Sequence, residues 1–139
     1  MKSKIRFVEN MQFIGTADSG HAVVMDAPPS VGGNNTGTKP SELLLMAFGG
    51  CSGMDVISIL RKKKQDVTNF EINVNGETPE SHPRSFTDIH IEYIVTGRNI
   101  SEDAVQRAID LSLEKYCMVG LTIGKAAKIT YSYKVMQEG

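Results

Sequence analysis

Three segments in the second half of the chain alternate between apolar and polar residues. They read FEINVN at residues 70–75, DIHIEYIV at residues 88–95 and KITYSYKV at residues 128–135. A period of two with one polar face is typical of strands in a half-exposed antiparallel sheet. We therefore predict an antiparallel sheet that covers one side of the hydrophobic core.

The first quarter of the chain is predicted to form short strands separated by turns. Its apolar residues lie between polar or glycine turns such as ADSGH at residues 17–21. They include Ile5, Phe7, Phe13 and Val23. A loop of turn-forming residues, APPSVGGNNTGTKP, follows at residues 27–40.

A long helix is predicted to begin at Pro40, with Thr38 as N-cap and Glu42 in the first turn, and to continue to Lys64. Its first half, residues 43–48, is apolar on every side, which indicates burial all round. A small domain rarely encloses such a helix alone. We therefore expect a homodimer with this helix near its centre.

Glycines interrupt the middle of this helix around one of the two cysteines. Gly49, Gly50 and Gly53 surround Cys51, although a glycine inside a helix costs about 1 kcal/mol relative to alanine. The missing side chains are expected to let another helix or a sheet approach closely.

A second helix is predicted after Ser101, its expected N-cap, with Glu102 and Asp103 in the first turn. Its inward positions lead towards Cys117 and are Val105, Ala108, Ile109 and Ser112. The order of strands, long helix, strands, helix and strand predicts a single α+β domain over residues 1–139.

Composition narrows the choice of partners. The 139 residues are 40% hydrophobic and 22% charged with a net charge of -1, so neither nucleic acid nor an anionic membrane is expected as a partner. The basic run Arg61–Lys64 fits a solvated helix C-terminus. The N-terminus MKSKIRFVEN lacks an apolar leader segment, and no stretch of roughly 18 apolar residues is expected to span a membrane, so we expect a cytoplasmic protein.

Two motifs are interpreted as structural. GGNNTGTK at residues 32–39 departs from the phosphate-binding pattern, because Thr38 separates the second glycine from the lysine, and we interpret it as a mobile loop. The histidines His21, His82 and His90 lack metal-ligand spacing, so no metal or cofactor is expected.

The two cysteines carry the candidate chemistry. A buried cysteine is usually a small hydrophobe, but Cys51 follows two glycines and lies one helical turn before Asp55. If Cys51 and Cys117 approach to a Cα separation of about 5.5 Å, they can form a disulfide. One thiolate would reduce a peroxide and become a sulfenic acid, the other would condense with it, and an external dithiol would restore both.

The chain resembles the superfamily of osmotically inducible protein C and the organic hydroperoxide resistance proteins (OsmC/Ohr). The likeness covers nearly the whole chain and rests on KPSELLLMAFGGCS, FTDIHIEYIVTGR, LSLEKYC and KITYSYKV, together with the two cysteines. The chain is most similar to a little-characterised bacterial branch with GGCS, DVISIL and EKYC.

The resemblance implies an intertwined α+β homodimer with antiparallel sheets around long central helices. It also implies thiol-dependent reduction of organic hydroperoxides in oxidative stress defence. Cys51 would be the peroxidatic cysteine and Cys117 the resolving one, no cofactor would be bound, and a dithiol such as a protein-bound lipoyl group would act as reductant.

Two residues of the better-studied hydroperoxide resistance branch are not at their expected positions. The glutamate that follows the helix-opening proline is replaced by Ser41, with Glu42 one residue later, and GTADSGH lacks the N-terminal arginine. A carboxylate at Asp55 would disfavour a nearby thiolate. The cations that could replace the arginine are Arg84, Arg98, Lys39 and His21.

Two other functions compete with the peroxidase. The first is a non-catalytic dimer that binds a small hydrophobic or electrophilic molecule in its interface pocket. The second is acyl hydrolysis by a cysteine and a histidine, which would require one of the histidines beside Cys51 or Cys117.

Overall fold

The computed structural model describes residues 1–139, which form two compact units, residues 1–44 and residues 45–139. The first unit contains an antiparallel sheet in the order β1–β2–β3. Its strands are β1 (Ser3–Glu9), β2 (Gln12–Ala17) and β3 (Ala22–Met25). These three strands confirm the short strands predicted for the first quarter of the chain.

One face of this first sheet is apolar and exposed. Phe7 lies opposite Phe13 in the register, and their rings meet edge to face at 5.5 Å, yet 61% of Phe7 and 39% of Phe13 remain exposed. An apolar hollow of about 430 Å³ lies between residues that include Ile5, Met11 and Met25. Within the first unit these side chains have no core to enter.

The glycine-rich loop is tied down by a buried carboxylate. Asp26 accepts hydrogen bonds from the Thr36 hydroxyl at 2.5 Å, the Thr36 N–H at 3.0 Å and the Ala27 N–H at 2.7 Å. The Thr36 hydroxyl does most to lower the pKa of Asp26, followed by the two backbone donors. A Cβ on Gly33 would lie 1.9 Å from the Ala27 carbonyl oxygen, so this glycine permits a close backbone contact. These hydrogen bonds attach the segment to Asp26, and its mobility stays a prediction.

Helix α1 (Pro40–Lys62) begins with a contact between neighbouring residues. The Glu42 carboxylate accepts from the Lys39 N–H at 2.8 Å and from the Thr38 hydroxyl at 3.2 Å, and these bonds lower the pKa of Glu42. Glu42 is the third residue of the helix, and its bond to the backbone N–H before the helix stabilises the helix start, as in a capping box. The helix ends two residues earlier than predicted, because Lys64 has a positive φ of 56°.

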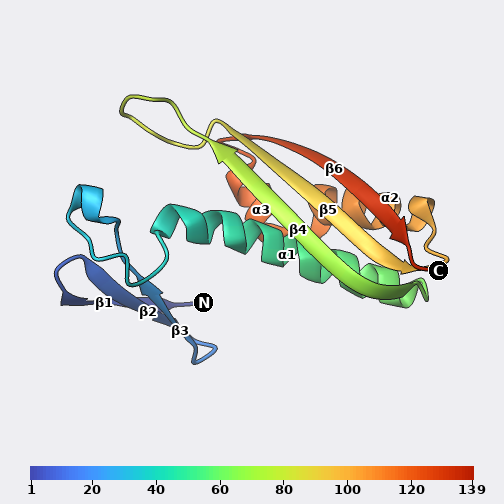
Figure 1. The fold of residues 1–139 in the computed structure, drawn as a ribbon, viewed down its shortest axis with the longest axis horizontal. Coiled ribbons are helices and arrows are strands. Elements are labelled where there is room, and N and C mark those ends of the chain that lie inside the picture. Colours follow the sequence, from blue (N-terminus) through green and yellow to red (C-terminus); the bar gives the residue numbers. More distant parts are fainter. The chain divides into compact units, whose positions relative to one another are not determined.

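The second unit is built on a sheet in the order β4–β5–β6 (Figure 1). Its strands are β4 (Asp66–Glu77), β5 (Asp88–Arg98) and β6 (Lys128–Gln137). All three predicted strands are confirmed, but β6 runs parallel to β5, so the prediction of a wholly antiparallel sheet is wrong. Helical segments between β5 and β6 carry the chain back to the end of the sheet where β5 starts, and a return of this kind gives a parallel pair.

These crossing segments are α2 (Glu102–Leu111), the π-helical turn η2 (Ser112–Tyr116) and α3 (Met118–Ile123). Ser101 caps α2 as predicted, with its side chain accepting from the Ala104 N–H at 3.2 Å. The apolar stripe of α2 packs against the inner face of the sheet. Fully buried residues of this core include Ile89, Ile91, Val95, Val105, Ala108 and Ile109.

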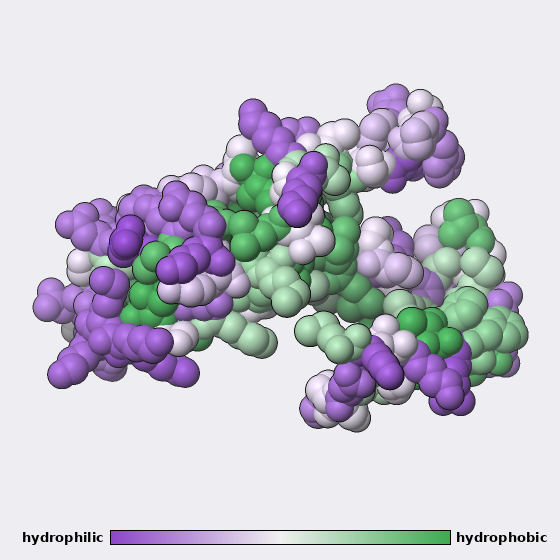
Figure 2. Space-filling model, turned by 180° about the vertical axis from the view of Figure 1, so that it is seen from behind, coloured by the Kyte–Doolittle hydropathy of each residue, from purple (hydrophilic) through white to green (hydrophobic).

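Helix α1 is buried on one side only. Phe48, Val56 and Leu60 are fully buried, whereas Met46 is 58% exposed and Met54 is 73% exposed. A single chain therefore covers only one side of α1, and burial of residues 43–48 on every side by a second copy stays a prediction. Figure 2 shows that apolar side chains form green patches on the surface of the protein, among purple polar side chains.

Helix α1 is also long and apolar enough to cross a membrane, contrary to our reading that no stretch reaches that length. Core helices of folded domains pass the same test of length and composition, and 33% of its apolar window is buried inside the protein.

Candidate functional site

The two cysteines come from segments that are far apart in the sequence. Cys51 lies in the middle of α1 and is partly exposed, whereas Cys117 follows η2 and is fully buried. Both are free thiols. The Cys51 side chain lies near enough to Cys117 to raise the pKa of the Cys117 thiol, so the fold brings together the pair that we identified in the sequence.

A π-helical turn sets the position of Cys117. The Cys117 N–H donates to the Ser112 carbonyl at 2.7 Å, across five residues, which closes the wide turn η2. Such single turns inside helical segments occur often at functional sites. The turn leaves Cys117 as the N-cap of α3, where its sulfur accepts from the Gly120 N–H at 3.3 Å. Helix α3 is a new element, too short to show a helical period in the sequence.

The surroundings of Cys117 favour the neutral thiol. Burial raises the pKa of Cys117 above its ordinary value, while the Gly120 N–H lowers it. The neighbouring Cys51 thiol and the negative charge of Asp55 both raise this pKa further. Because Cys117 is buried and holds its proton, the partly exposed Cys51 is the thiol better placed to meet an external reagent.

A buried chain of hydroxyl groups lies beside the thiols. The Ser112 hydroxyl donates to the Asp55 carboxylate at 3.0 Å, and Ser52 lies 2.7 Å from Ser112 and 2.6 Å from the Tyr93 hydroxyl. Because each hydroxyl has one proton, the direction of donation runs from Tyr93 to Ser52, then to Ser112, and ends at Asp55. Every buried polar atom in this series of hydroxyl groups has a hydrogen-bond partner.

Tyr93 occupies the innermost end of this chain. Burial raises the pKa of Tyr93 to about 12, an effect that its hydrogen bond to Ser52 partly offsets. Negative charge on Asp55, or on Cys117 once it ionises, raises this pKa as well, which places the Tyr93 hydroxyl in the same neighbourhood as the thiols. At neutral pH Tyr93 is therefore a neutral hydrogen-bond donor.

Asp55 connects the site to solvent. It lines a pocket of about 410 Å³ between α1 and the region around η2. The other residues lining this pocket are Ser58, Ile59, Lys62, Lys63, Leu111 and Tyr116. Asp55 thus has one side on the buried hydroxyl groups and the other on a solvent-accessible pocket.

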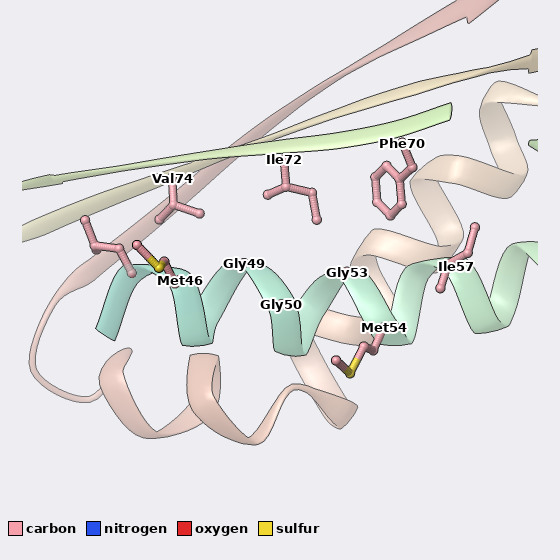
Figure 3. A pocket seen from close by; sticks show the side chains of 10 residues that line it. Met46, Gly49, Gly50, Gly53, Met54, Ile57, Phe70, Ile72 and Val74 are labelled. Atoms are coloured by element: carbon pink, nitrogen blue, oxygen red, sulfur yellow. The ribbon is translucent and has the colours of Figure 1, made fainter. Parts of the chain in front are cut away.

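Two of the three glycines of α1 lie against β4 (Figure 3). A Cβ on Gly49 would lie 3.1 Å from Cγ2 of Val74, and one on Gly53 would lie 2.8 Å from Cδ1 of Ile72. These two glycines therefore let β4 approach the helix, as we expected for a sheet or a helix. Gly50 has no atom within 4 Å of the place where a Cβ would stand.

An apolar groove follows the same side of α1. It has a volume of about 530 Å³, and in Figure 3 side chains from β4 point towards the helix across it. The residues that line it are Leu45, Met46, Gly49, Gly50, Gly53, Met54, Ile57, Phe70, Ile72 and Val74.

The candidate cations of the second unit are occupied elsewhere. Arg98 forms a salt bridge with Asp66 at 3.3 Å, and Arg84 donates to the Glu80 carbonyl. The His90 ring binds Thr130 at 2.7 Å and Ser132 at 2.9 Å on the polar face of the sheet, opposite the face that carries Ile89 and Ile91. This position does not support a Cys–His pair with His90.

Sequence reasoning found the thiols and Asp55 but missed the hydroxyl chain. The sequence pattern indicates Ser112 only as an inward position of a helix and Tyr93 only as part of an alternating strand. A serine within an apolar stripe was the available signal, because a buried hydroxyl requires a hydrogen-bonding partner.

The chain matches known proteins along most of its length. Residues 32–132 match the family model described as OsmC-like protein. Protein YhfA of Escherichia coli K12 is 46% identical over 139 residues, with 98% of each chain covered. A hypothetical protein from Aquifex aeolicus VF5 is 30% identical in its crystal structure, with a TM-score of 0.86 over 99% of this chain and 97% of that one.

More distant structures have the same fold. A Legionella pneumophila protein described as an organic hydroperoxide resistance protein OsmC is 12% identical and superposes with a TM-score of 0.69, covering 96% of both chains. At this level of identity the likeness concerns the fold alone.

Proposed function

Because the chain belongs to the OsmC-like protein family, we propose that it is a thiol-dependent peroxidase that reduces organic hydroperoxides in oxidative stress defence. A peroxidase-like role is supported at the level of the family by its members described as organic hydroperoxide resistance proteins. The single observation that carries the proposal for this chain is the pair of adjacent free thiols, one partly exposed and one buried.

In the first step the Cys51 thiolate attacks the distal oxygen of the hydroperoxide. The O–O bond breaks, Cys51 becomes a sulfenic acid, and the alkoxide leaves as an alcohol after taking up a proton. The sulfur loses two electrons and the peroxide gains them. The partial exposure of Cys51 supports its role as the attacking group.

In the second step Cys117 resolves the sulfenic acid. Its sulfur forms the disulfide with Cys51, its proton and the sulfenic hydroxyl leave together as water, and no further oxidant is needed. An external dithiol, such as a lipoyl group on a partner protein, then reduces the disulfide by thiol exchange and is itself oxidised to a disulfide. The buried, protonated state of Cys117 suits a thiol that is used only after Cys51 has reacted.

The peroxidase is expected to work without the arginine of the hydroperoxide resistance branch. Arg84 and Arg98 are engaged with Glu80 and Asp66, and Glu42 stabilises the start of α1. With less help for the Cys51 thiolate, the reaction is expected to be slower than in that branch, since the thiolate is the attacking form.

The active form is proposed to be a homodimer of one OsmC-like domain, residues 1–139, in the cytoplasm. The exposed apolar face of the first sheet and the exposed face of α1 support this assembly, because apolar side chains such as Phe7, Met46 and Met54 would be covered by a second copy.

The test is stoichiometric oxidation by cumene hydroperoxide under anaerobic conditions. The wild-type chain should lose both thiols and gain one disulfide within the chain, Cys51→Ser should consume no peroxide, and Cys117→Ser should stop at the sulfenic acid. Two thiols that remain titratable beside undiminished peroxide would contradict the proposal.

A ligand-binding protein is the second candidate, favoured by the apolar groove between α1 and β4. In that case hydrophobic probes would bind while the thiols stay reduced. Acyl hydrolysis would instead release product from activated esters without a reductant and would tolerate Cys117→Ser.

A further inference from the structure

The two segments that carry the cysteines are tied together a second time, away from the sulfurs. The Ser112 hydroxyl in η2 contacts two groups of α1, the Asp55 carboxylate at 3.0 Å and the Ser52 hydroxyl at 2.7 Å. Ser112 is fully buried; its bond to Ser52 lies in the interior, and its bond to Asp55 is partly buried. Ser112 is therefore the point at which η2 is held on α1.

The same residue also holds Cys117. The Ser112 carbonyl accepts the Cys117 N–H at 2.7 Å, which closes the π-helical turn. On α1, Asp55 lies one helical turn after Cys51, so the two side chains project from the same face. The hydrogen bond from Ser112 to Asp55, which we call the tether, therefore joins η2 to α1 close to the place where Cys117 lies near Cys51.

We propose that Ser112 and Asp55 are positioning residues that hold the Cys117 thiol against Cys51 for disulfide formation. The proposal deepens the proposed function, because it assigns a means of placing the resolving thiol. Neither side chain needs to touch the substrate. The role of the pair is to keep the two cysteine-bearing segments together while the sulfurs change from two thiols to one disulfide.

The polarity of the tether supports a role beyond core filling. Burying a hydroxyl is unfavourable unless its hydrogen bonds are satisfied, and this chain satisfies three hydroxyls by ending at a carboxylate. A chain of donors aligned towards a charge is stronger than isolated neutral bonds. Hydrogen bonds fix distance and direction, which apolar contacts in the same place would not.

The tether can be tested without peroxide. The purified protein is equilibrated anaerobically with mixtures of reduced and oxidised glutathione, and the fraction with the Cys51–Cys117 disulfide is measured by mass spectrometry after thiol blocking. In this exchange the two protein thiols lose two electrons and two protons, and one oxidised glutathione becomes two reduced ones. The equilibrium constant reports how well the fold holds the sulfurs together.

Ser112→Ala should lower this equilibrium constant by about tenfold, the effect of losing roughly 1.4 kcal/mol from the hydrogen bonds of Ser112. Asp55→Ala should lower it less, since it removes one bond, and Asp55→Asn should restore most of the loss because an amide oxygen still accepts from Ser112. Asp55 is partly exposed, so its variants test the proposal even if Ser112→Ala fails to fold.

Tyr93→Phe is the matched control. It removes a buried hydroxyl from the same chain, but the bond that it loses joins β5 to α1 and leaves Ser112 untouched. The equilibrium constant of Tyr93→Phe should stay within about twofold of wild type, a smaller change than one hydrogen bond represents. The proposal would be overturned if Ser112→Ala and Asp55→Ala have the same equilibrium constant as the wild type. It would also be overturned if the equilibrium constant of Tyr93→Phe falls as far as that of Ser112→Ala.

The two proposals can fail separately. A protein that ignores hydroperoxide but shows the predicted changes with glutathione would keep the tether and lose the peroxidase. A protein that reduces hydroperoxide through Cys51 and Cys117 but whose disulfide equilibrium is indifferent to Ser112 would keep the peroxidase and lose the tether.

Discussion

Gly120 lies directly against the ring of Phe48. A Cβ on Gly120 would stand 2.8 Å from Cε1 of Phe48 and 3.2 Å from the Cys117 sulfur. Phe48 is fully buried in α1, one helical turn before Cys51, so its ring is enclosed by other core residues. The absence of a side chain at Gly120 therefore allows the first turn of α3, with Cys117, to sit close to α1.

Gly120→Ala is expected to disturb this approach. The added methyl must displace either Phe48 or the Cys117 sulfur, and overfilling a packed core costs about 1–3 kcal/mol. Unfolding in urea should show the loss of stability, and disulfide formation between Cys51 and Cys117 should slow. Gly50→Ala is the control in the same chain, because its Cβ would meet no atom within 4 Å. Equal stability in the two variants would contradict this account.

The two thiols should differ in their reaction with iodoacetamide. Cys51 is partly exposed, whereas Cys117 is fully buried and has a raised pKa. Since only the thiolate reacts, and its fraction falls about tenfold for each unit by which a pKa rises, Cys51 should be alkylated at least about tenfold faster at neutral pH. Peptide mass spectrometry over time measures both rates. Comparable rates in the folded protein would show that Cys117 is accessible and reactive.

Alkaline stability should depend on Tyr93. Burial raises the pKa of Tyr93 from 10.0 to about 12, so the folded protein keeps a proton that the unfolded chain loses above pH 10.0. The contribution of Tyr93 is therefore complete below pH 10.0 and is lost as the pH rises towards 12.

Urea unfolding of wild type and Tyr93→Phe across that range is the corresponding measurement. The free energy of unfolding should fall more steeply with pH in the wild type, because phenylalanine has no proton to lose. Tyr131→Phe is a control for an exposed phenol in the same sheet. Identical slopes for wild type and Tyr93→Phe would rule out the retained proton as the cause.

The exposed side of α1 is expected to form part of the dimer interface. Gly50→Leu should shift the protein towards the monomer, because a leucine would fill space that a second copy needs. Within the same chain the substitution is tolerated, because no atom lies within 4 Å of the place where a Cβ on Gly50 would stand. Light scattering at several protein concentrations measures the assembly. Glu71→Leu places a leucine on the polar, exposed face of β4 and should leave the assembly unchanged. If Gly50→Leu remains as dimeric as wild type, this part of α1 lies outside the interface.

Acid should weaken the loop that Asp26 holds. Hydrogen bonds from Thr36 keep the pKa of Asp26 below its ordinary value of 3.8. The stabilisation is therefore present above pH 3.8 and is lost as the pH falls through the lower, folded-state pKa. Asp26→Asn should have a lower Tm than wild type at neutral pH, and the two Tm values should converge in acid. A constant difference in Tm at all pH values would contradict a role for the charge.

Much of the local structure was predictable from the sequence. The strands at residues 70–75, 88–95 and 128–135 follow from alternation, because each side chain on a strand faces either the core or solvent. The start of α2 follows from Ser101, whose side chain meets a backbone N–H three residues later. The pair of cysteines was also recognisable from local features, because glycines flank Cys51 and Cys117 lies where a predicted helix ends.

The tertiary structure alone decided how these pieces meet. The parallel direction of β6, the bond between Ser112 and Asp55, and the proximity of Cys51 and Cys117 each join residues that are remote in the sequence. Periodicity reports only which face of an element is buried. The path through α2, the π-helical turn and α3 determines which buried groups come together, and it depends on the whole core.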